Sequence, residues 1–150
     1  MILQFVSENT PSSAYATQEI KSDNHPKISR PSDTVTFFGG FFDRKKQEYF
    51  CVLNLDGSNQ VISARIITIG LLNHTLVHPR EVFRDAILDS AASIIAVHNH
   101  PSGSVEPSNQ DLSITKQIKD AGDIIGIKLL DHIIITPHGG YSSMRERGDL

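Results

Sequence analysis

Apolar and polar residues follow two different periods along this chain, and these periods predict which segments are strands and which are helices. Two β-rich runs flank residues 56–59, a turn sequence that contains Asp-Gly, so we expect a β-hairpin there. Further along the chain, apolar residues spaced three and four apart predict amphipathic helices. The expected strands cover residues 49–55, 61–69, 93–97 and 126–136, with a short strand or turn at 141–144, and the expected helices cover residues 78–89 and 108–121.

The order of these elements, ββαβαβ, predicts a mixed α/β domain in which helices flank a central mixed β-sheet. Residues 1–30 are rich in Ser, Thr, Asn, Pro and Lys, and we predict a flexible N-terminal arm over residues 1–26, followed by one compact domain over residues 27–150. For residues 31–43 the sequence does not decide whether a helix forms. Pro31-Ser32-Asp33 favours a helix start, whereas the β-branched run that follows and Gly39-Gly40 oppose one.

Composition and charge narrow the class of protein. The chain has 150 residues, of which 39% are hydrophobic and 21% charged, as in ordinary soluble globular domains. A net charge of −3, with no strongly basic run, argues against a protein that holds nucleic acid mainly by neutralising phosphates. The single cysteine, Cys51, lies in an apolar strand and has no intrachain partner for a disulfide, which favours a buried thiol and a cytoplasmic location. No run approaches the length of a membrane span, so we expect no membrane partner.

Residues 98–111 carry the most informative chemistry. His98 and His100 follow the expected strand 93–97, and because side chains alternate across a strand they leave its end on one face while Asn99 points away. Ser108 and Asp111 are three residues apart and share a face at the first turn of the expected helix. Two imidazole nitrogens, one carboxylate oxygen and a water would give a four-coordinate zinc site with an open catalytic position.

Each half of this motif also has a plain structural interpretation. Ser108 and Asp111 can form an N-cap pair, with the hydroxyl at the cap and the acid in the first turn of the helix. A His-x-His pair at a strand end can simply lie on the surface. The spacing by itself therefore leaves a metal site and a capped helix beside a surface histidine pair as alternatives.

Taken together, these residues resemble the JAMM signature of the JAB1/MPN metalloprotease domains: His98-x-His100, seven residues, Ser108, two residues and Asp111. More narrowly, the sequences HNHPSG at 98–103, PREVF at 79–83 and DHIII at 131–135 resemble the RadC family of JAB-domain proteins.

The resemblance covers the chain from about Lys27 to the C-terminus, and it implies the cytidine deaminase-like architecture of JAB/MPN domains. RadC-type proteins often carry an N-terminal helix-hairpin-helix region. Because no region of that size precedes Lys27, the chain resembles a stand-alone JAB domain.

The resemblance implies that His98, His100 and Asp111 hold a zinc ion, Zn2+, and that Ser108 is placed to hydrogen-bond the oxyanion of the reaction. It also implies an upstream glutamate that works through the zinc-bound water, and Glu48, which opens the first core strand, occupies that place. A carboxylate there could take a proton from water whose pKa the metal lowers to about 7.

Three assignments have competing interpretations. Glu48 could be a solvated acid at the start of a strand. Glu81 is the rival general base, although its place in a helix start is better explained by a favourable interaction with the helix dipole. For His132 we expect a structural hydrogen bond, or support of a metal ligand, rather than direct ligation.

Two classes of function follow from these residues and the resemblance. The first is a zinc-dependent hydrolase of the JAMM type, in which metal-activated water attacks an amide or isopeptide bond. The alternative is a DNA-repair or mobile-element-associated module whose metal site serves nucleic-acid processing or partner binding. The partners left open are a peptide, isopeptide or nucleic-acid substrate and a second copy of the chain in a homodimer. A purely structural zinc is usually closed by a fourth protein ligand, so three ligands with a candidate glutamate favour the hydrolase.

Overall fold

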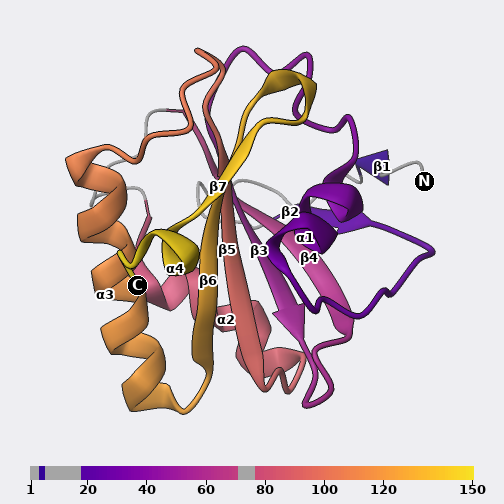
Figure 1. Cartoon of the computed structure of the whole chain (residues 1–150). Coiled ribbons are helices and arrows are strands. Elements are labelled where there is room, and N and C mark those ends of the chain that lie inside the picture. The colour runs from indigo at the N-terminus through magenta and orange to yellow at the C-terminus, as the bar shows by residue number, and fades with distance from the viewer. Residues whose placement is uncertain (1–3, 6–17, 71–76) are drawn as a thin grey trace, which may run out of the picture.

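The computed structural model describes residues 4–5, 18–70 and 77–150. It contains a seven-stranded mixed sheet with helices on both faces, which confirms the predicted fold class (Figure 1). The strands are β1 (Gln4–Phe5), β2 (Gln18–Lys21), β3 (Tyr49–Leu55), β4 (Val61–Ile69), β5 (Ser93–Asn99), β6 (Lys128–Ile135) and β7 (Tyr141–Ser143). The helices are α1 (Pro31–Phe38), α2 (Pro79–Leu88), α3 (Asn109–Ile125), α4 (Met144–Arg147) and the short 3-10 helix η1 (Pro137–Gly139).

The sheet has the strand order β1-β2-β4-β3-β5-β6-β7. All neighbouring strands are antiparallel except β5 and β6, which are parallel and are joined through α3. Since β5 lies between β3 and β6 and has covered faces on both sides, every residue from Ser93 to Asn99 is buried. This position explains why its sequence is a continuous apolar run rather than an alternating one. The loop from β5 to α3 starts at the carboxyl end of this central strand.

Two hydrophobic cores lie on the two faces of the sheet. On one face, Phe37 and Phe38 of α1 pack with Ile95 and Val97 of β5. On the other face, α2 and α3 pack on Phe50, Ile94 and Ala96. His98 follows the alternation of Ile94 and Ala96, so its side chain lies on the face covered by α2 and α3.

Close packing of α2 against α3 depends on Gly122. A Cβ atom at this position would lie 3.1 Å from the Phe83 ring and 2.5 Å from the carbonyl oxygen of Ile127. The glycine therefore lets Phe83 of α2 sit directly against the backbone of α3. This contact helps to fix α3, which carries one side of the candidate site.

The expected elements are confirmed, and two of them are longer than their sequence patterns indicated. β5 continues through His98 and Asn99, because His98 pairs with Phe50 on β3 and both residues pair with β6. α3 continues to Ile125 and ends at Gly126, whose φ of 84° is the left-handed cap that glycine favours. The ambiguous segment after residue 30 forms α1, in which the Asp33 carboxylate accepts the backbone N–H groups of Ser29 and Arg30.

Part of the expected N-terminal arm belongs to the sheet. β2 pairs antiparallel with β4 through Gln18, Glu19 and Ile20, and Ile20 is buried in the core on the α1 face. At these residues the structure differs from the expectation of a flexible arm. The polar composition concealed the strand because pairing needs mainly backbone groups, and one buried apolar side chain anchors it. Residues 1–3 and 6–17 lie outside the described part of the chain.

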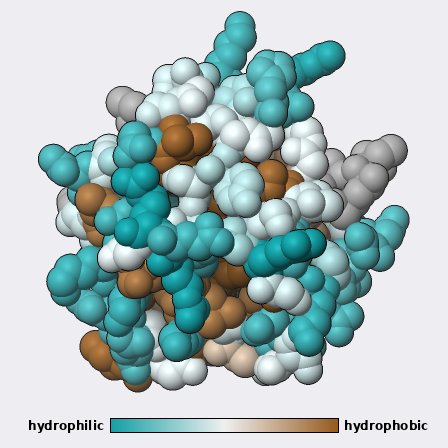
Figure 2. Space-filling model, in the orientation of Figure 1, coloured by the Kyte–Doolittle hydropathy of each residue, from teal (hydrophilic) through white to brown (hydrophobic). Residues whose placement is uncertain are grey.

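The surface mixes hydrophilic and hydrophobic residues, with an apolar area at the C-terminal end of α3, where Ile124 and Ile125 are exposed (Figure 2). A cavity of about 610 Å³ lies on the α1 face of the sheet, lined by residues that include Thr34, Ile95 and Ile133, and is separated from His98 by the sheet.

None of the helices in the described residues combines the length and apolar composition that a bilayer span needs. Cys51 is buried as expected, and burial raises the pKa of its thiol.

Candidate metal centre

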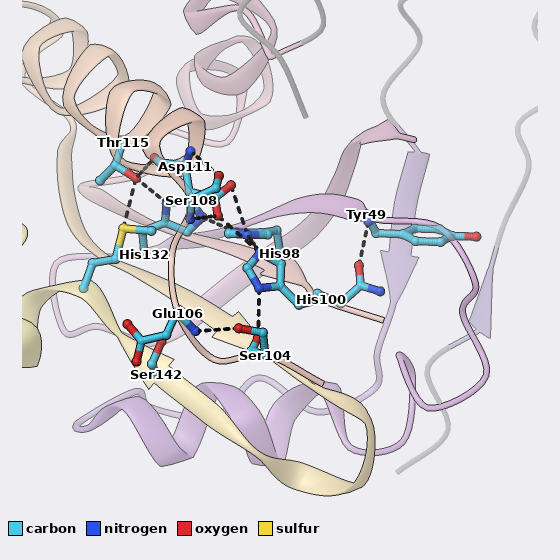
Figure 3. Close-up of polar contacts among 12 residues, drawn as sticks. Tyr49, His98, His100, Ser104, Glu106, Ser108, Asp111, Thr115, His132 and Ser142 are labelled. Carbon is cyan, nitrogen blue, oxygen red and sulfur yellow. Dashed lines mark hydrogen bonds and ion pairs between the residues drawn. The ribbon is translucent and has the colours of Figure 1, made fainter. Parts of the chain in front are cut away.

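Three side chains from two elements and the loop between them converge at the carboxyl end of β5 (Figure 3). His98 belongs to β5, His100 follows it directly, and Asp111 lies in the first turn of α3. The Nε2 atoms of His98 and His100 are 2.9 Å apart. The two carboxylate oxygens of Asp111 lie 3.3 Å from His98 Nε2 and 3.2 Å from His100 Nε2. The sequence motif is thus assembled into a single donor cluster.

The site is almost closed to solvent. His98 is fully buried, Asp111 is 2% exposed, and His100, at 8%, is the most exposed of the three. Buried polar groups must be hydrogen-bonded or bind a metal. The direction from which solvent can enter is therefore the His100 side of the cluster.

The orientation of His100 is fixed by the loop that follows it. Its backbone N–H donates to the carbonyl oxygen of Ile135, at the end of β6, over 3.0 Å. Its Nδ1 lies 2.8 Å from the carbonyl oxygen of Ser104, which can only accept a hydrogen bond. The proton of the neutral ring therefore sits on Nδ1, and the lone pair of Nε2 points toward His98 and Asp111. Gly103, with a φ of 87°, permits the tight turn that returns Ser104 to the ring.

The orientation of His98 is fixed by a buried hydrogen-bonded chain through His132 and Thr115. His98 Nδ1 lies 2.7 Å from His132 Nε2, and His132 Nδ1 lies 2.5 Å from the Thr115 hydroxyl. The Thr115 hydroxyl lies 2.6 Å from the carbonyl oxygen of Asp111 and 3.1 Å from Met144 Sδ, a weaker acceptor. Its one proton therefore goes to the carbonyl oxygen, and its oxygen accepts the Nδ1–H of His132. His132 Nε2 must then accept the Nδ1–H of His98. This direction of donation leaves the lone pair of His98 Nε2 free for the cluster.

The surroundings keep His132 neutral, as the chain requires. Its ring is fully buried, and burial, together with the charge of His98, holds the pKa of His132 well below its usual range. The ring also meets Phe50 edge-on at a centroid distance of 5.5 Å. His132 is thus a hydrogen-bonding partner of His98, as the structural hydrogen bond expected from the sequence requires.

Asp111 combines a structural and an electrostatic role. Its Oδ2 accepts the backbone N–H of Ser108 at 2.8 Å, while its own N–H donates to the Ser108 hydroxyl at 3.0 Å, which completes a capping box. Burial alone would raise the pKa of Asp111, but hydrogen bonds from His100 and His98 outweigh it and hold the pKa well below its usual range. Hydrogen bonding to Asp111, followed by weaker effects, raises the pKa of His100. The carboxylate is therefore ionised and faces both imidazoles.

This donor set fits a divalent zinc ion. With both neutral rings protonated on Nδ1, two lone pairs face each other across 2.9 Å, an arrangement that needs either a proton or a cation between them. Donor separations of 2.9, 3.2 and 3.3 Å are close to the roughly 3.3 Å between two ligands of a tetrahedral zinc. Within the described residues, the group of potential ligands contains no fourth His, Cys, Asp or Glu, so one coordination position stays open to water or substrate.

Ser108 occupies the N-cap of α3, so the capping alternative considered for it is observed. In that role the hydroxyl oxygen only accepts, from the N–H of Asp111. Its O–H remains able to donate to a group bound at the open position, because it donates to no protein group in the described part of the chain. The cap and a role toward substrate are therefore compatible.

The structure places the two candidate glutamates differently. Phe50 of β3 forms with His98 the last pair between β3 and β5, and Glu48 lies two residues before Phe50, next to the start of β3. Phe50 packs on the face of α2 and α3, whereas Tyr49 packs on the α1 face, so alternation places Glu48 on the histidine face. The negative charge of Glu48 is also among the causes that raise the pKa of His100. Glu81, in contrast, lies in the first turn of α2 between Arg80 and Arg84.

Sequence reasoning missed Thr115 and Ser104 in this site, and it missed the backbone groups that hydrogen-bond the side chain of Asn99. Thr115 lies one helical turn after Asp111, so spacing on α3 could have placed it on the same face. Ser104 contributes only its backbone carbonyl, which leaves no signal in the identity of the residue. Asn99 points away from the histidines as expected, and there it hydrogen-bonds the backbone at Gln47 and Tyr49.

A mixed sheet with a parallel β5–α3–β6 unit, and a two-histidine, one-carboxylate cluster at the end of β5, defines a domain of the JAB type. Residues 28–149 match the family model described as RadC-like JAB domain, and the chain belongs to this family.

Curated relatives agree with this assignment. The chain is 48% identical over 141 residues to a UPF0758 protein of Methanospirillum hungatei, covering 94% of this chain and 59% of that protein. It is 46% identical over 130 residues to a UPF0758 protein of Rubrobacter xylanophilus, covering 87% and 56% of the two chains. A UPF0758 protein of Chlorobium chlorochromatii is 47% identical over 124 residues, with coverages of 83% and 55%. The chain therefore spans little more than half the length of these relatives.

Proposed function

We propose that this chain is a zinc-dependent hydrolase of the JAMM type that cleaves amide or isopeptide bonds. The observation that carries the proposal is the donor cluster of His98, His100 and Asp111, with both Nε2 lone pairs directed inward and no fourth protein ligand among the described residues. A structural zinc is normally closed by four protein ligands, whereas a catalytic zinc keeps a position for water.

In this function, a bound zinc would act as a Lewis acid and would lower the pKa of its water toward about 7. His98, His100 and Asp111 would hold the ion, while His132 and the Ser104 carbonyl keep the two imidazoles in the tautomers that could bind it. The rigid β5 end and α3 start keep the donors in place before the ion arrives.

Glu48 is the proposed general base and Ser108 the proposed oxyanion donor. Glu48 lies two residues before Phe50, the strand partner of His98, and its charge contributes to the raised pKa of His100. From there its carboxylate would accept the proton of the attacking water and deliver it to the leaving amine. The Ser108 O–H donates to the carbonyl oxygen of the substrate as negative charge develops there, while the capping bond keeps its oxygen in position. Both groups thus come from segments that adjoin the cluster, the start of β3 and the N-cap of α3.

The test compares Glu48→Gln with Glu81→Gln in zinc-loaded protein. The probes are fluorogenic linear peptides, ε-lysyl isopeptides, and single-stranded and supercoiled DNA. We expect wild-type protein to cleave an amide or isopeptide probe. Glu48→Gln should lower the rate by about 10²- to 10⁴-fold at unchanged zinc content, because an amide cannot accept the proton. Glu81→Gln should leave the rate unchanged, since Glu81 is held by Arg80 and Arg84 at the start of α2.

Other results would contradict the proposal. Full activity of Glu48→Gln, or inactivity of Glu81→Gln alone, would remove Glu48 as the general base. Cleavage of DNA probes without cleavage of any peptide or isopeptide would favour the nucleic-acid-processing alternative. The net charge of −3 does not favour that alternative, because strong binding to DNA depends largely on basic contacts to phosphates.

A further inference from the structure

Asn99 lies between His98 and His100 in the sequence, but its side chain points away from the two imidazoles. It is 1% exposed. Its Nδ2 donates to the carbonyl oxygen of Gln47 over 3.0 Å, and its Oδ1 accepts the backbone N–H of Tyr49 over 2.6 Å. Figure 3 shows the second of these bonds at Tyr49. Both hydrogen-bonding groups of the amide are therefore used on one short stretch of backbone.

That stretch is the one that carries Glu48. Gln47 and Tyr49 are its two neighbours, so the Asn99 amide bridges the backbone directly across the glutamate. On the other side, the carbonyl oxygen of Glu48 accepts the backbone N–H of Gly70 over 2.8 Å. Glu48 itself precedes β3, which begins at Tyr49. The amide of Asn99 thus takes the place of ladder bonds that a regular strand would provide at this position.

Alternation of side chains explains why this arrangement couples the base to the metal ligands. Tyr49 packs on the α1 face, the face to which Asn99 points, so Glu48 is left on the face of His98 and His100. The segment His98–His100 then sends two imidazoles toward the ion and one amide toward the backbone that holds the glutamate. One rigid strand end therefore sets the distance between ligands and base.

We propose that Asn99 is a positioning residue that fixes the backbone of residues 47–49 and thereby holds the Glu48 carboxylate beside the metal centre. Its role in catalysis rests on the proposed function, since it matters for turnover only if Glu48 is the general base. Its role in positioning can be measured without any substrate.

The variant is Asn99→Leu, which keeps the volume of the side chain and removes both hydrogen-bonding groups. The matched control is Asn54→Leu. Asn54 is also 1% exposed, and its Nδ2 donates to Ser63 Oγ at 3.1 Å and to Asp89 Oδ2 at 3.0 Å, at the other end of β3. Both variants lose two buried side-chain bonds, but only Asn99→Leu loses the contact with the Glu48 segment.

The experiment measures amide hydrogen exchange and backbone order parameters by NMR in the full chain with zinc present. We expect the Tyr49 amide to exchange at least about tenfold faster in Asn99→Leu, and the Glu48 amide order parameter to fall toward the flexible range below about 0.6. Zinc affinity, measured against a chromophoric chelator, should stay within about threefold, because β3 and β6 still hold β5. Asn54→Leu should leave both amides unchanged.

Activity on the cleaved probe separates positioning from a general loss of stability. Asn99→Leu should approach the rate of Glu48→Gln, and the double variant should be no slower than Glu48→Gln alone, because both changes remove the same group from the reaction. If the double variant loses as much again, Asn99 acts on something other than Glu48 and the proposal is wrong.

Wild-type exchange of the Tyr49 amide in Asn99→Leu would also overturn it, as would equal loss of protection in Asn54→Leu. Should Asn99→Leu fail to fold, the wild-type protein still decides, since an unprotected Tyr49 amide there is incompatible with the bond to Asn99. If Glu48→Gln keeps full activity while Tyr49 still responds to Asn99→Leu, the general-base assignment fails and the positioning contact stands.

Discussion

The hydroxyl of Thr115 decides which nitrogen of His98 carries the proton, and Thr115→Val tests this directly. Valine has the same shape as threonine, and residue 115 is 1% exposed, so the change removes the hydroxyl with little change in packing. Without it, the Nδ1–H of His132 has lost its acceptor at 2.5 Å. The neutral ring of His132 then carries its proton on Nε2 at lower cost, and donates it to His98 Nδ1. That exchange moves the His98 proton to Nε2, the atom that should bind the ion.

Two magnitudes can be expected for this change. A buried N–H left without an acceptor costs about 1–3 kcal/mol, which is the expected loss in unfolding free energy of the zinc-free protein. Loss of an outer hydrogen-bonding partner of a metal-ligating histidine typically weakens metal binding about 10- to 100-fold. We therefore expect the zinc dissociation constant of Thr115→Val to rise by about that factor, while Thr115→Ser, which keeps the hydroxyl and loses only the methyl group, stays close to wild type.

Competition with a chromophoric zinc chelator measures the affinities, and urea unfolding of the zinc-free proteins measures stability. Wild-type zinc affinity in Thr115→Val would refute the role of this hydroxyl in setting the tautomer. Equal weakening in Thr115→Ser and Thr115→Val would show that packing of Thr115 near Met144 matters rather than hydrogen bonding.

Three further predictions follow from the site and the core. Elemental analysis should find no stoichiometric zinc in His98→Ala or in Asp111→Asn. Asp111→Asn should lower the unfolding free energy of the zinc-free protein by only about 1 kcal/mol, since an amide oxygen can still accept the Ser108 N–H and mainly the helix-dipole interaction is lost; a much larger loss of stability would contradict this. In zinc-free protein the hydrogen bond to Asp111 raises the pKa of His100, so the stabilisation from His100 is complete below the ordinary pKa of 6.5 and is lost as pH rises through the folded-state pKa, whereas burial lowers the pKa of His132, so the stabilisation from neutral His132 is lost as pH falls below 6.5. Urea unfolding midpoints should therefore be highest near pH 6.5, and a monotonic profile across that pH would count against these shifts. Gly122→Ala should lower the unfolding free energy by about 1–3 kcal/mol because its Cβ would meet Phe83 and the Ile127 carbonyl, while Gly57→Ala, with nothing within 4 Å of its Cβ, should change it little; equal effects in thermal unfolding would show that close packing is not the cause.

The sequence by itself determined the order of the core elements and the ligand motif. Hydrophobic periodicity located β3, β4, α2, β5, α3 and β6, because each of these must bury one face or both faces against the sheet. The spacing of His98, His100, Ser108 and Asp111 could be interpreted as one cluster, since local rules fix which side chains share the end of a strand and the start of a helix.

The sequence pattern did not predict the strand β2, because its four mostly polar residues form a strand only by pairing with the backbone of β4. The sequence did not decide whether α1 forms for a similar reason. The hydrogen bonds from the backbone of Ser29 and Arg30 to Asp33 favour the helix, whereas its β-branched residues oppose it, and composition does not show which effect is larger.

Only the tertiary structure decided what supports the cluster. Thr115 and His132 are joined across α3 and β6, and Asn99 reaches Gln47 and Tyr49 about fifty positions earlier in the chain, with sequence separations of 52 and 50. Such contacts depend on strand register and on the direction of individual hydrogen bonds, which no pattern along one segment specifies. The residues that would bind the ion can therefore be predicted from the sequence, whereas the groups that set the tautomers of His98 and His100 and hold Glu48 in place are defined by the packing of the sheet.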